Sequence, residues 1–400
     1  MPDTPEKPDL VKKRGKIVLL HFVGQMPLAG IAWQAVHYLA PLQKLGFETW
    51  YVEDHGANPY DPRISSVVMD CAYNLDYLRA ALERHGLAER WAYWDAINDV
   101  YHGLSREAVR TLYAEADALI NLCGATQLRE EHLRCPVRIM IDTDPVYEQI
   151  KYAKADPAAR AYVDAHTHFF TYGANLGTPA CSIPLSGVPW RATRPPVDLD
   201  LWPEPPKDAA APPCFTTIAT WENKGKNIDF GGESYLWSKH TNFLEYLDLP
   251  RHRPQTCFRM AMLPPDEAVR ETVEAGGWGL VDPRPVSAGM DAYRDFISGS
   301  RGEFTVAKDI YVRPNSGWFS DRAVCYLAAG RPVVTMRTGF GSYCPAGHGL
   351  FDYASKDEAL AAIDTIAADY GSHSRAAREL AGDCFAGERV LAQLLAETGL

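Results

Sequence analysis

The chain has 400 residues, more than the roughly 250–300 that one hydrophobic core usually serves, so we expect two domains of about 200 residues each. With 46% hydrophobic and 23% charged residues, the composition excludes a disordered or fibrous chain. The formal net charge of −11 disfavours a nucleic-acid partner, while a local basic pocket could still hold a small phosphorylated ligand.

Membrane and secretion signals are not expected. The longest apolar runs, such as residues 17–23, are strand-sized and far short of the roughly 20 residues of a membrane span. Residues 1–15 lack the apolar core of a signal peptide and predict a disordered tail. The nine cysteines form no CxxC pair, which argues against a zinc ribbon, a redox dithiol or a disulfide framework. We therefore expect a cytoplasmic protein with buried thiols and no integral membrane segment.

A proline-rich stretch divides the chain near its midpoint. Nine prolines fall within residues 184–213, and proline supplies no N–H group to a helix or sheet. The sequence predicts a first domain over 16–190, a linker over 191–213 and a second domain over 214–372. A C-terminal helix over 373–400 follows.

Short apolar runs alternate with amphipathic ones in both domains. In the first, we expect helices over 31–45 and 106–116 and strands over 16–23, 48–53, 118–122, 137–141 and 168–172. In the second, we expect strands over 215–219, 257–262, 279–281, 304–306, 332–335 and 350–353. This alternation predicts an α/β fold of two doubly wound, Rossmann-like domains facing a cleft. Ligands of such sheets bind beyond the carboxyl ends of the strands.

The loop after the first strand is the first candidate site. It contains Gly24 and Gln25, but its glycines do not have the GxGxxG spacing of a dinucleotide site. His21, at the strand end, could act as a general base or be a hydrogen-bonded core residue. The notable features of the loop after 48–53 are Asp54 and His55, which could be catalytic or belong to a solvated acidic loop.

A second acidic pair follows the strand over 137–141. Asp142 and Asp144, two positions apart, could bind a divalent metal, but no third or fourth ligand is identifiable. The order of Asp144 and Pro145 favours a helix cap with proline at the first helical position. We therefore expect no metal site.

The strongest phosphate-type pattern lies after residue 303. A Ser-Gly turn before a helix exposes backbone N–H groups to an anion, and lysine or arginine can add charge. A second glycine loop follows the next strand, and lysines beside aromatic residues occur earlier in this half. The candidate phosphate-binding residues are Lys224, Lys239, Lys308, Ser316, Gly317, Trp318, Phe319, Ser320, Asp321, Arg322, Thr338 and Gly339.

Taken together, these patterns resemble bacterial GT-B-type glycosyltransferases. The resemblance rests on two α/β halves, the glycine-bearing first loop, and the run Ala329-Gly330-Arg331-Pro332-Val333-Val334, which is similar to the Glu-Ala-x-Ala-x-Gly-x-Pro-Val-Val signature of the donor domain. This sequence departs from the family pattern at both acidic positions, which fall on Trp318 and Cys325. Asp321 and Arg322 stand nearby as candidates to take over their contacts.

The resemblance implies a division of labour between the halves. The second half would bind a nucleotide diphosphate sugar as co-substrate, with no other cofactor. The first half would bind a small-molecule or other acceptor, with Gly24, Gln25, Asp142 and Asp144 on the acceptor side. His21, Asp54 and His55 would be the catalytic candidates. Transfer would be metal-independent, and the C-terminal helix would cross back to the first domain.

Two alternatives stay open at this point. The same fold could carry a nucleotide-sugar epimerase or hydrolase, because a fold does not fix a reaction. A non-catalytic, transferase-like binding or activating partner is also compatible with the missing acidic pair. The sequence does not identify the acceptor, the sugar, the nucleotide base or the oligomeric state.

Overall fold

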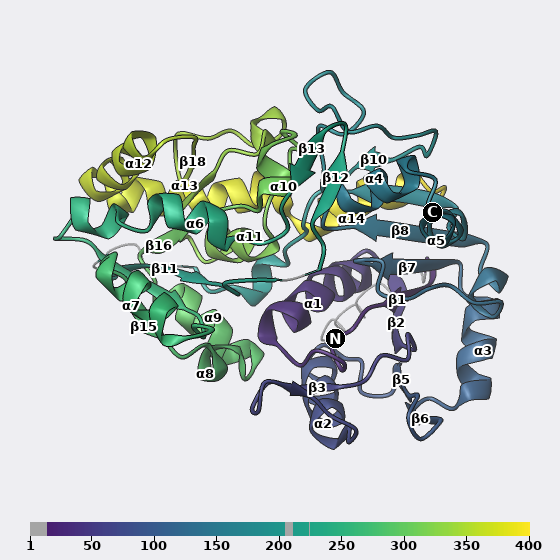
Figure 1. Cartoon of the computed structure of the whole chain (residues 1–400). Coiled ribbons are helices and arrows are strands. Elements are labelled where there is room, and N and C mark those ends of the chain that lie inside the picture. Colours follow the sequence, from purple (N-terminus) through teal and green to yellow (C-terminus); the bar gives the residue numbers. More distant parts are fainter. Residues whose placement is uncertain (1–13, 205–210, 224) are drawn as a thin grey trace, which may run out of the picture.

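Two sheets form the framework of the chain in the computed structural model, which describes residues 14–204, 211–223 and 225–400 (Figure 1). The first sheet has eight strands in the order β10-β9-β8-β7-β1-β2-β5-β6, all parallel except β6. Their bounds are β1 (Gly15–Leu20), β2 (Phe47–Glu53), β5 (Trp91–Asp95), β6 (Val100–Gly103), β7 (Ala118–Leu122), β8 (Val137–Asp142), β9 (His168–Thr171) and β10 (Arg191–Ala192).

Helices cover both faces of this sheet because its central strands are apolar on both sides. Ile17 and Leu19 of β1 belong to the core that includes α1, whereas Val18 and Leu20 pack in the core that includes α3. The other elements of this half are α1 (Ala29–Lys44), β3 (Tyr60–Asp61), β4 (Ser66–Val67), α2 (Ala72–Glu83), α3 (Arg106–Glu115), η1 (His132–Arg134), α4 (Tyr147–Ala153), α5 (Pro157–Asp164) and η2 (Leu199–Leu201).

The second sheet has six parallel strands in the order β15-β14-β11-β16-β17-β18. They are β11 (Cys214–Ile218), β14 (Cys257–Ala261), β15 (Gly279–Val281), β16 (Gly302–Thr305), β17 (Val333–Met336) and β18 (Leu350–Tyr353). A separate two-stranded ribbon joins β12 (Ile228–Phe230) and β13 (Glu233–Tyr235). In both sheets the chain reverses its direction of winding beside the first strand, at β1/β7 and at β11/β16.

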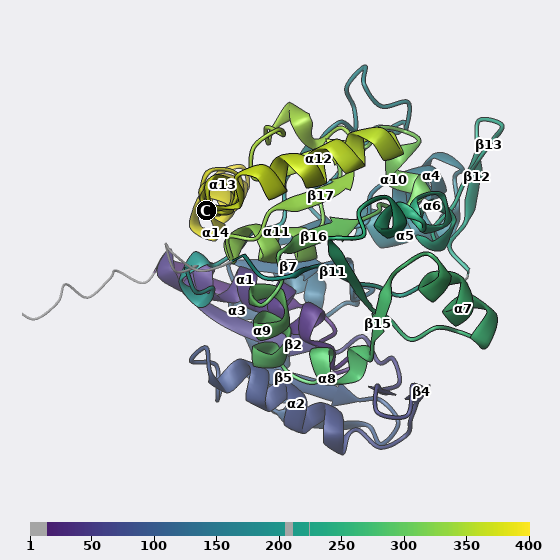
Figure 2. The same cartoon turned by 90° about the vertical axis from the view of Figure 1, so that its left-hand side faces the viewer.

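The second half carries helices on both faces of its sheet as well. The helices of residues 214–400 are α6 (His240–Tyr246), η3 (Leu249–His252), α7 (Glu267–Ala275), α8 (Pro283–Ser287), α9 (Met290–Ser298), α10 (Asp309–Val312), α11 (Asp321–Ala328), η4 (Phe340–Ser342), α12 (Lys356–Ala368), α13 (Tyr370–Phe385) and α14 (Gly387–Ala396), the last of which packs on the first half. The predicted fold of two doubly wound α/β domains is confirmed. The helix α9 lies beside α1 of the first half in both views (Figures 1 and 2).

The expected single C-terminal helix is two helices. Residue Ala386 has an extended backbone, and the Gly387 N–H donates to Val197 O while Val197 N–H donates to Phe385 O. A side chain at Gly387 would meet Pro41 of α1, because its Cβ would lie 2.4 Å from Pro41 Cγ. The break therefore lets α14 turn onto α1 of the first half.

The predicted tail and linker differ from the structure in detail. Residues 1–13 and 205–210 lie outside the described residues, but β1 already begins at Gly15. Within the predicted linker, β10 adds to the edge of the first sheet, and the buried Trp202 donates its Nε1–H to His37 Nε2 at 3.0 Å. These residues pack on the first half because Trp202 carries a large apolar ring that Trp33 and His37 cover.

A disulfide joins Cys214 and Cys257, so the expectation of thiols only is wrong. The two residues are direct partners on the parallel neighbours β11 and β14, with their Cα atoms 4.3 Å apart. They are separated by 43 positions in sequence, so only the pairing of the strands brings them together. The remaining seven cysteines are free thiols.

Candidate functional site

A cavity of about 720 Å³ lies between the two halves, at the carboxyl ends of β1 and β11. This is where doubly wound sheets bind their ligands. The first half contributes mainly apolar and aromatic side chains, and the second half contributes the loop after β11, the helix α8 and the start of α11. The lining residues are Met26, Leu28, Gly30, Ile31, Gln34, Tyr60, Pro62, Arg63, Ser65, Tyr73, Ile218, Ala219, Thr220, Asn223, Leu263, Pro283, Arg284, Ser287, Ala288, Tyr293, Ser320, Asp321 and Arg322.

Asp321 carries the one carboxyl group among the described residues that line this cavity. It is the first residue of α11, whose start is capped by the Ser320 side chain accepting from Ala323 N–H. Tyr172 OH donates to Asp321 Oδ1 at 3.3 Å, and the Gln34 amide also hydrogen-bonds to the carboxyl group. Burial raises the pKa of Asp321 to about 7. The carboxyl group can therefore gain or lose a proton near neutral pH.

His21 lies behind Gln34 and does not line the cavity. Its Nε2 is 3.0 Å from Gln34 Oε1, and its buried Nδ1 has no hydrogen-bond partner among the described residues. Burial lowers the pKa of His21 to about 3, so the imidazole is neutral and a weak base at neutral pH. This environment fits the core alternative better than the predicted general base.

The predicted site residues Gly24, Gln25 and His55 contact the buried Glu53 and do not line the cavity. The buried Glu53 carboxylate accepts the N–H groups of Gly24 at 2.7 Å and Gln25 at 2.5 Å. The same carboxylate lies 3.3 Å from His55 Nε2. These contacts fold the first loop over the end of β2, so only its later residues, Met26 and Leu28, reach the cavity.

Asp54 belongs to a closed ion-pair cluster instead of the cavity. Arg129 Nη2 donates to its carboxylate at 2.7 Å, His132 Nε2 lies 3.1 Å away and Tyr113 OH donates at 2.9 Å. Burial opposes the charge of Asp54, yet His132 and Arg129 hold its pKa below the ordinary value. The structure thus gives Asp54 a structural ion pair, and sequence spacing could not reveal partners about 75 residues away.

Asp142 and Asp144, the two acidic residues at the end of β8, make different contacts. Asp142 accepts from Gln149 Nε2 at 2.8 Å and from Thr171 Oγ1 at 3.1 Å, and burial raises its pKa to about 7. Asp144 pairs with Lys308 Nζ of the other half at 2.9 Å. No helix begins at Pro145, because α4 starts at Tyr147. Lys308 and Asp144 therefore form a bridge between the halves.

The two glycine loops predicted to hold phosphates pack against Asn175 of the first half. Asn175 N–H donates to Ser316 O at 3.0 Å, and its amide Nδ2 donates to Gly339 O at 3.3 Å. Gly317 N–H is already paired with Thr338 O at 2.6 Å. The glycines are required because a Cβ at Gly317 would lie 2.8 Å from Asn175 N. These loops thus form the contact between the halves.

Their aromatic neighbours are part of the same contact. Trp318 stacks on Tyr311 with 4.3 Å between ring centroids and donates its Nε1–H to Thr143 O at 3.0 Å. Phe319 packs on the rings of Phe340 and Phe385. Neither lines the cavity, and the buried Cys325 does not either.

We expect Gly339→Ala to destabilise the protein. Its φ of 94° and a Cβ position 2.3 Å from Asn175 Nδ2 make alanine costly, with roughly 1–2 kcal/mol from the left-handed backbone alone. Gly341→Ala is the matched control, because nothing lies within 4 Å of its added Cβ. Urea unfolding of both variants measures the difference. Equal unfolding midpoints would contradict the assigned contact.

The predicted phosphate-binding cations of the second half differ in the partners that they already have. Arg322 donates to Glu303 Oε1 at 2.5 Å, to Thr305 Oγ1 at 2.9 Å and to Ile218 O. Burial opposes its charge, but Glu303 keeps the pKa of Arg322 above its usual value. Lys239 forms no ion pair with any described residue, and burial and the charge of Arg322 lower its pKa. Lys224 lies outside the described residues.

Lys239 is connected to the cavity wall through the adjacent residue Ser238. Ser238 Oγ accepts Asn223 N–H at 2.7 Å and donates to Asn223 O at 2.8 Å, and Asn223 lines the cavity. The ammonium group of Lys239 is also 5.9 Å from the Trp318 ring centroid. Of the predicted phosphate-binding cations that the structure describes, Lys239 is the one without an ion-pair partner, and its lowered pKa means that a nearby negative group would stabilise its charged form.

Gln34 and Tyr172 are the site residues that the sequence reasoning missed. Gln34 hydrogen-bonds to Asp321 and approaches His21, and Cys123 Sγ donates to its Oε1 at 3.2 Å. The available signal was a polar amide among the mostly apolar residues in the first part of α1. Tyr172 follows β9 and gives no comparable signal.

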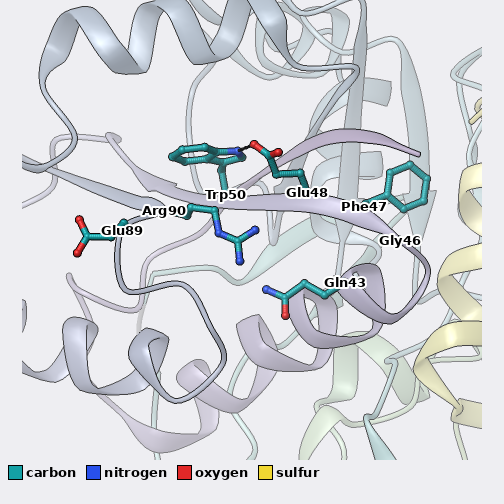
Figure 3. Close-up of a pocket in the computed structure, with 7 residues that line it drawn as sticks. All are labelled: Gln43, Gly46, Phe47, Glu48, Trp50, Glu89 and Arg90. Carbon is teal, nitrogen blue, oxygen red and sulfur yellow. Dashed lines mark hydrogen bonds between the residues drawn. The ribbon is translucent and has the colours of Figure 1, made fainter. Parts of the chain in front are cut away.

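Another pocket, of about 520 Å³, is shown in Figure 3. Its residues come from the end of α1, the start of β2 and the turn before β5: Gln43, Gly46, Phe47, Glu48, Trp50, Glu89 and Arg90. It therefore lies at the amino ends of the strands. Because ligands of such sheets bind at the opposite ends, we do not assign the site here.

Comparison with known proteins identifies the fold. No protein-family model and no curated protein matches the chain. Solved structures do match: AviGT4, a glycosyltransferase involved in avilamycin A biosynthesis, has 13% identity and a TM-score of 0.53 over 96% of both chains. HepE from Anabaena in complex with UDP and glucose has 13% identity and a TM-score of 0.56, covering 96% of this chain and 100% of its own.

A third match is an alpha-glucosyltransferase in complex with UDP and a 13-mer DNA, with 9% identity and a TM-score of 0.60 over 96% of this chain and 99% of that one. The chain thus has the GT-B fold, as the resemblance implied. From the net charge we expected no nucleic-acid partner. That expectation is wrong, because several of these neighbours were solved with DNA. Among the described residues, no helix is long and apolar enough to cross a membrane.

Proposed function

We propose that the protein transfers a sugar from a nucleoside diphosphate sugar to an acceptor hydroxyl in the cavity between its halves. The observation that carries this proposal is Asp321, the single carboxyl group described on the cavity wall, with a pKa raised to about 7 by burial. A group with this pKa can accept the proton of a hydroxyl nucleophile at neutral pH. The GT-B fold supports the same chemistry.

In the proposed reaction, the acceptor oxygen forms a bond to the anomeric carbon while the bond from that carbon to the diphosphate oxygen breaks. The acceptor proton passes to Asp321. The diphosphate leaves toward the cationic side of the second half, where Lys239 and the N-terminal end of α11 favour negative charge. Tyr172 and Gln34 orient the carboxylate through their hydrogen bonds.

We assign the donor to residues 214–372 and the acceptor to residues 16–190. The second half supplies Arg284 and Arg322, and the first half supplies the apolar wall of Met26, Leu28 and Ile31 besides Arg63, which pairs with Asp61. We further propose that no metal ion bridges the diphosphate. A magnesium site usually uses one or two carboxylates, and Asp321 is already held by Tyr172 and Gln34.

The experiment that tests this function is a donor assay. UDP-sugars, GDP-sugars and dTDP-sugars are incubated with a panel of acceptors that includes phenols, sugars and short DNA duplexes, with and without Mg²⁺. Transfer or donor hydrolysis that does not depend on Mg²⁺ is the expected result. Tight binding of nucleotide without any turnover across the panel would favour the non-catalytic alternative.

We expect Lys239→Met to weaken UDP binding by about ten- to a hundredfold, because a hydrogen bond to a charged group contributes roughly 1.5–3 kcal/mol. Uridine, which lacks the diphosphate, should bind both proteins equally. The matched control is Lys356→Met. Lys356 is the first residue of α12 and pairs with Asp248. Calorimetric titration of the folded variants measures the affinities. If Lys239→Met bound UDP as tightly as the control, Lys239 would not contact the diphosphate.

A further inference from the structure

Three side chains with different metal-binding atoms, none of which lines the cavity, meet near the β6 edge of the first sheet. Cys71 precedes α2, Asp95 ends β5 and His102 lies in β6. The antiparallel pairing of β5 with β6, in which Tyr93 faces His102, brings the imidazole next to the end of β5. One ligand atom from each of the three side chains lies within 4.8 Å of the other two.

The distance between two of these atoms fits a shared ion. Cys71 Sγ lies 3.6 Å from Asp95 Oδ2. An ion at the usual Zn–S distance of about 2.3 Å and Zn–O distance of about 2.0 Å separates the two ligands by about 3.5 Å in a tetrahedral site. The thiol proton, which now points at the carboxylate, occupies the line between them. An ion would replace that proton.

The carboxylate is already held in place. Asp95 Oδ1 accepts N–H groups from Ile97 at 3.0 Å and Asn98 at 3.2 Å, and Oδ2 accepts from Asn98 Nδ2 at 2.7 Å. Such outer contacts orient metal-ligating carboxylates in known sites. Asp95 therefore presents its Oδ2 toward Cys71 without further rearrangement.

The cluster lacks a positive charge. No lysine or arginine among the described residues forms an ion pair with Asp95. A divalent cation would supply the missing positive charge and replace the thiol proton of Cys71. The cluster of Asp54, Glu131 and His132 differs, because Arg129 already forms ion pairs with both of its carboxylates.

We propose that Cys71, Asp95 and His102 form a binding site for a divalent transition metal of the Zn²⁺ type, with water in the fourth position. Thiolate and imidazole ligands select zinc-like ions over Mg²⁺ or Ca²⁺. The ion would tie the start of α2 to the β5–β6 edge. Tyr73, two residues after Cys71, lines the cavity, so the ion would fix one part of the cavity wall. This inference does not depend on the proposed glycosyl transfer.

Cobalt titration tests the site, because Co²⁺ bound by a thiolate gives a sulfur-to-metal charge-transfer absorption. Untagged protein is stripped with a chelator and titrated with Co²⁺, followed by competition with Zn²⁺. We expect the absorption to saturate at one equivalent and to disappear when Zn²⁺ is added. Cys71→Ser should abolish the absorption, and His102→Ala should weaken Co²⁺ binding at least tenfold. Circular dichroism confirms that each variant is folded.

Two controls make the result decisive. Cys181→Ser removes another buried thiol and should leave the absorption unchanged. Cys344→Ser disrupts the hydrogen-bonded thiols of Cys344 and Cys384 and should likewise leave the absorption unchanged. Absence of any absorption, or an absorption that survives both Cys71→Ser and His102→Ala, would overturn the proposal. If Cys71→Ser failed to fold, retention of full Co²⁺ affinity by His102→Ala would still overturn it.

Discussion

Asp321→Asn should lower kcat for sugar transfer by about 10²- to 10⁴-fold, the usual contribution of a positioned acid or base. The substitution keeps the hydrogen-bonding shape of the side chain but cannot accept the acceptor proton. The wild-type rate should rise with pH through about 7, where the carboxyl group loses its proton, and this limb should vanish in the variant. Steady-state kinetics with the best donor and acceptor measure both effects.

Asp364→Asn is the control for this substitution, because Asp364 pairs with Arg253 on the surface, away from the cavity. It should leave kcat unchanged. A rate for Asp321→Asn within threefold of the control would remove Asp321 from the proton transfer. It would leave the proposed transferase function to be decided by the donor assay.

The same pKa also predicts how folding stability depends on pH. Asp321 binds its proton more tightly in the folded state than in the unfolded state, where its pKa is near 3.8. Its contribution to stability is therefore fully present below about pH 4 and is lost as pH rises through about 7. The shift corresponds to about 4 kcal/mol at most. Asp321→Asn should thus be at least as stable as the wild type above pH 7, whereas a marked loss there would contradict the raised pKa.

Arg322→Ala should destabilise the protein by about 3–5 kcal/mol, because it leaves the Glu303 carboxylate buried without its counter-charge. Glu303 is fully buried, and its Oε2 already has no hydrogen-bond partner among the described residues. Arg322 also satisfies Thr305 and Ile218 O, so its removal opens several bonds at once. Chemical denaturation monitored by tryptophan fluorescence measures the loss.

Two further variants separate the buried charge from the loss of a side chain. Arg253→Ala removes an arginine from the exposed pair with Asp364 and should cost at most about 1 kcal/mol. The double variant Arg322→Met/Glu303→Leu removes both buried charges and should recover much of the loss. If Arg322→Ala were as stable as Arg253→Ala, the ion pair with Glu303 would not hold the start of α11.

Local pattern was sufficient to predict most of the fold. The buried strands β1, β7, β11 and β17 are short β-branched or apolar runs, and such runs identify strands without tertiary information. The edge elements β5 and β6 were not predicted, since aromatic and polar residues there do not alternate in a strand-like way. The overall architecture was therefore accessible, including both edge strands of the second sheet, whereas the β5–β6 end of the first sheet was not.

The candidate site was less accessible because its contacts join distant parts of the chain. Glycine after a strand has the same appearance whether it faces a phosphate or, as at Gly317 and Gly339, the side chain and backbone of Asn175. An arginine at a helix start is equally ambiguous, and only the structure places Glu303 next to Arg322. Asp321 was among the candidates. The sequence could not show that it is the one carboxyl group described on the cavity wall, because this requires knowing that Asp54 pairs with Arg129 elsewhere.

The path of α14 bears on how the chain is made. This helix, whose Leu391, Leu394 and Leu395 are buried, packs on α1, an element that leaves the ribosome about 350 residues earlier. While the second half is being synthesised, the apolar stripe of α1 that α14 will occupy stays uncovered. The nascent first half is thus open to chaperones, or to self-association, until α14 emerges. Because α14 follows the whole second sheet in the chain, the first half is completed only after the second half has been synthesised.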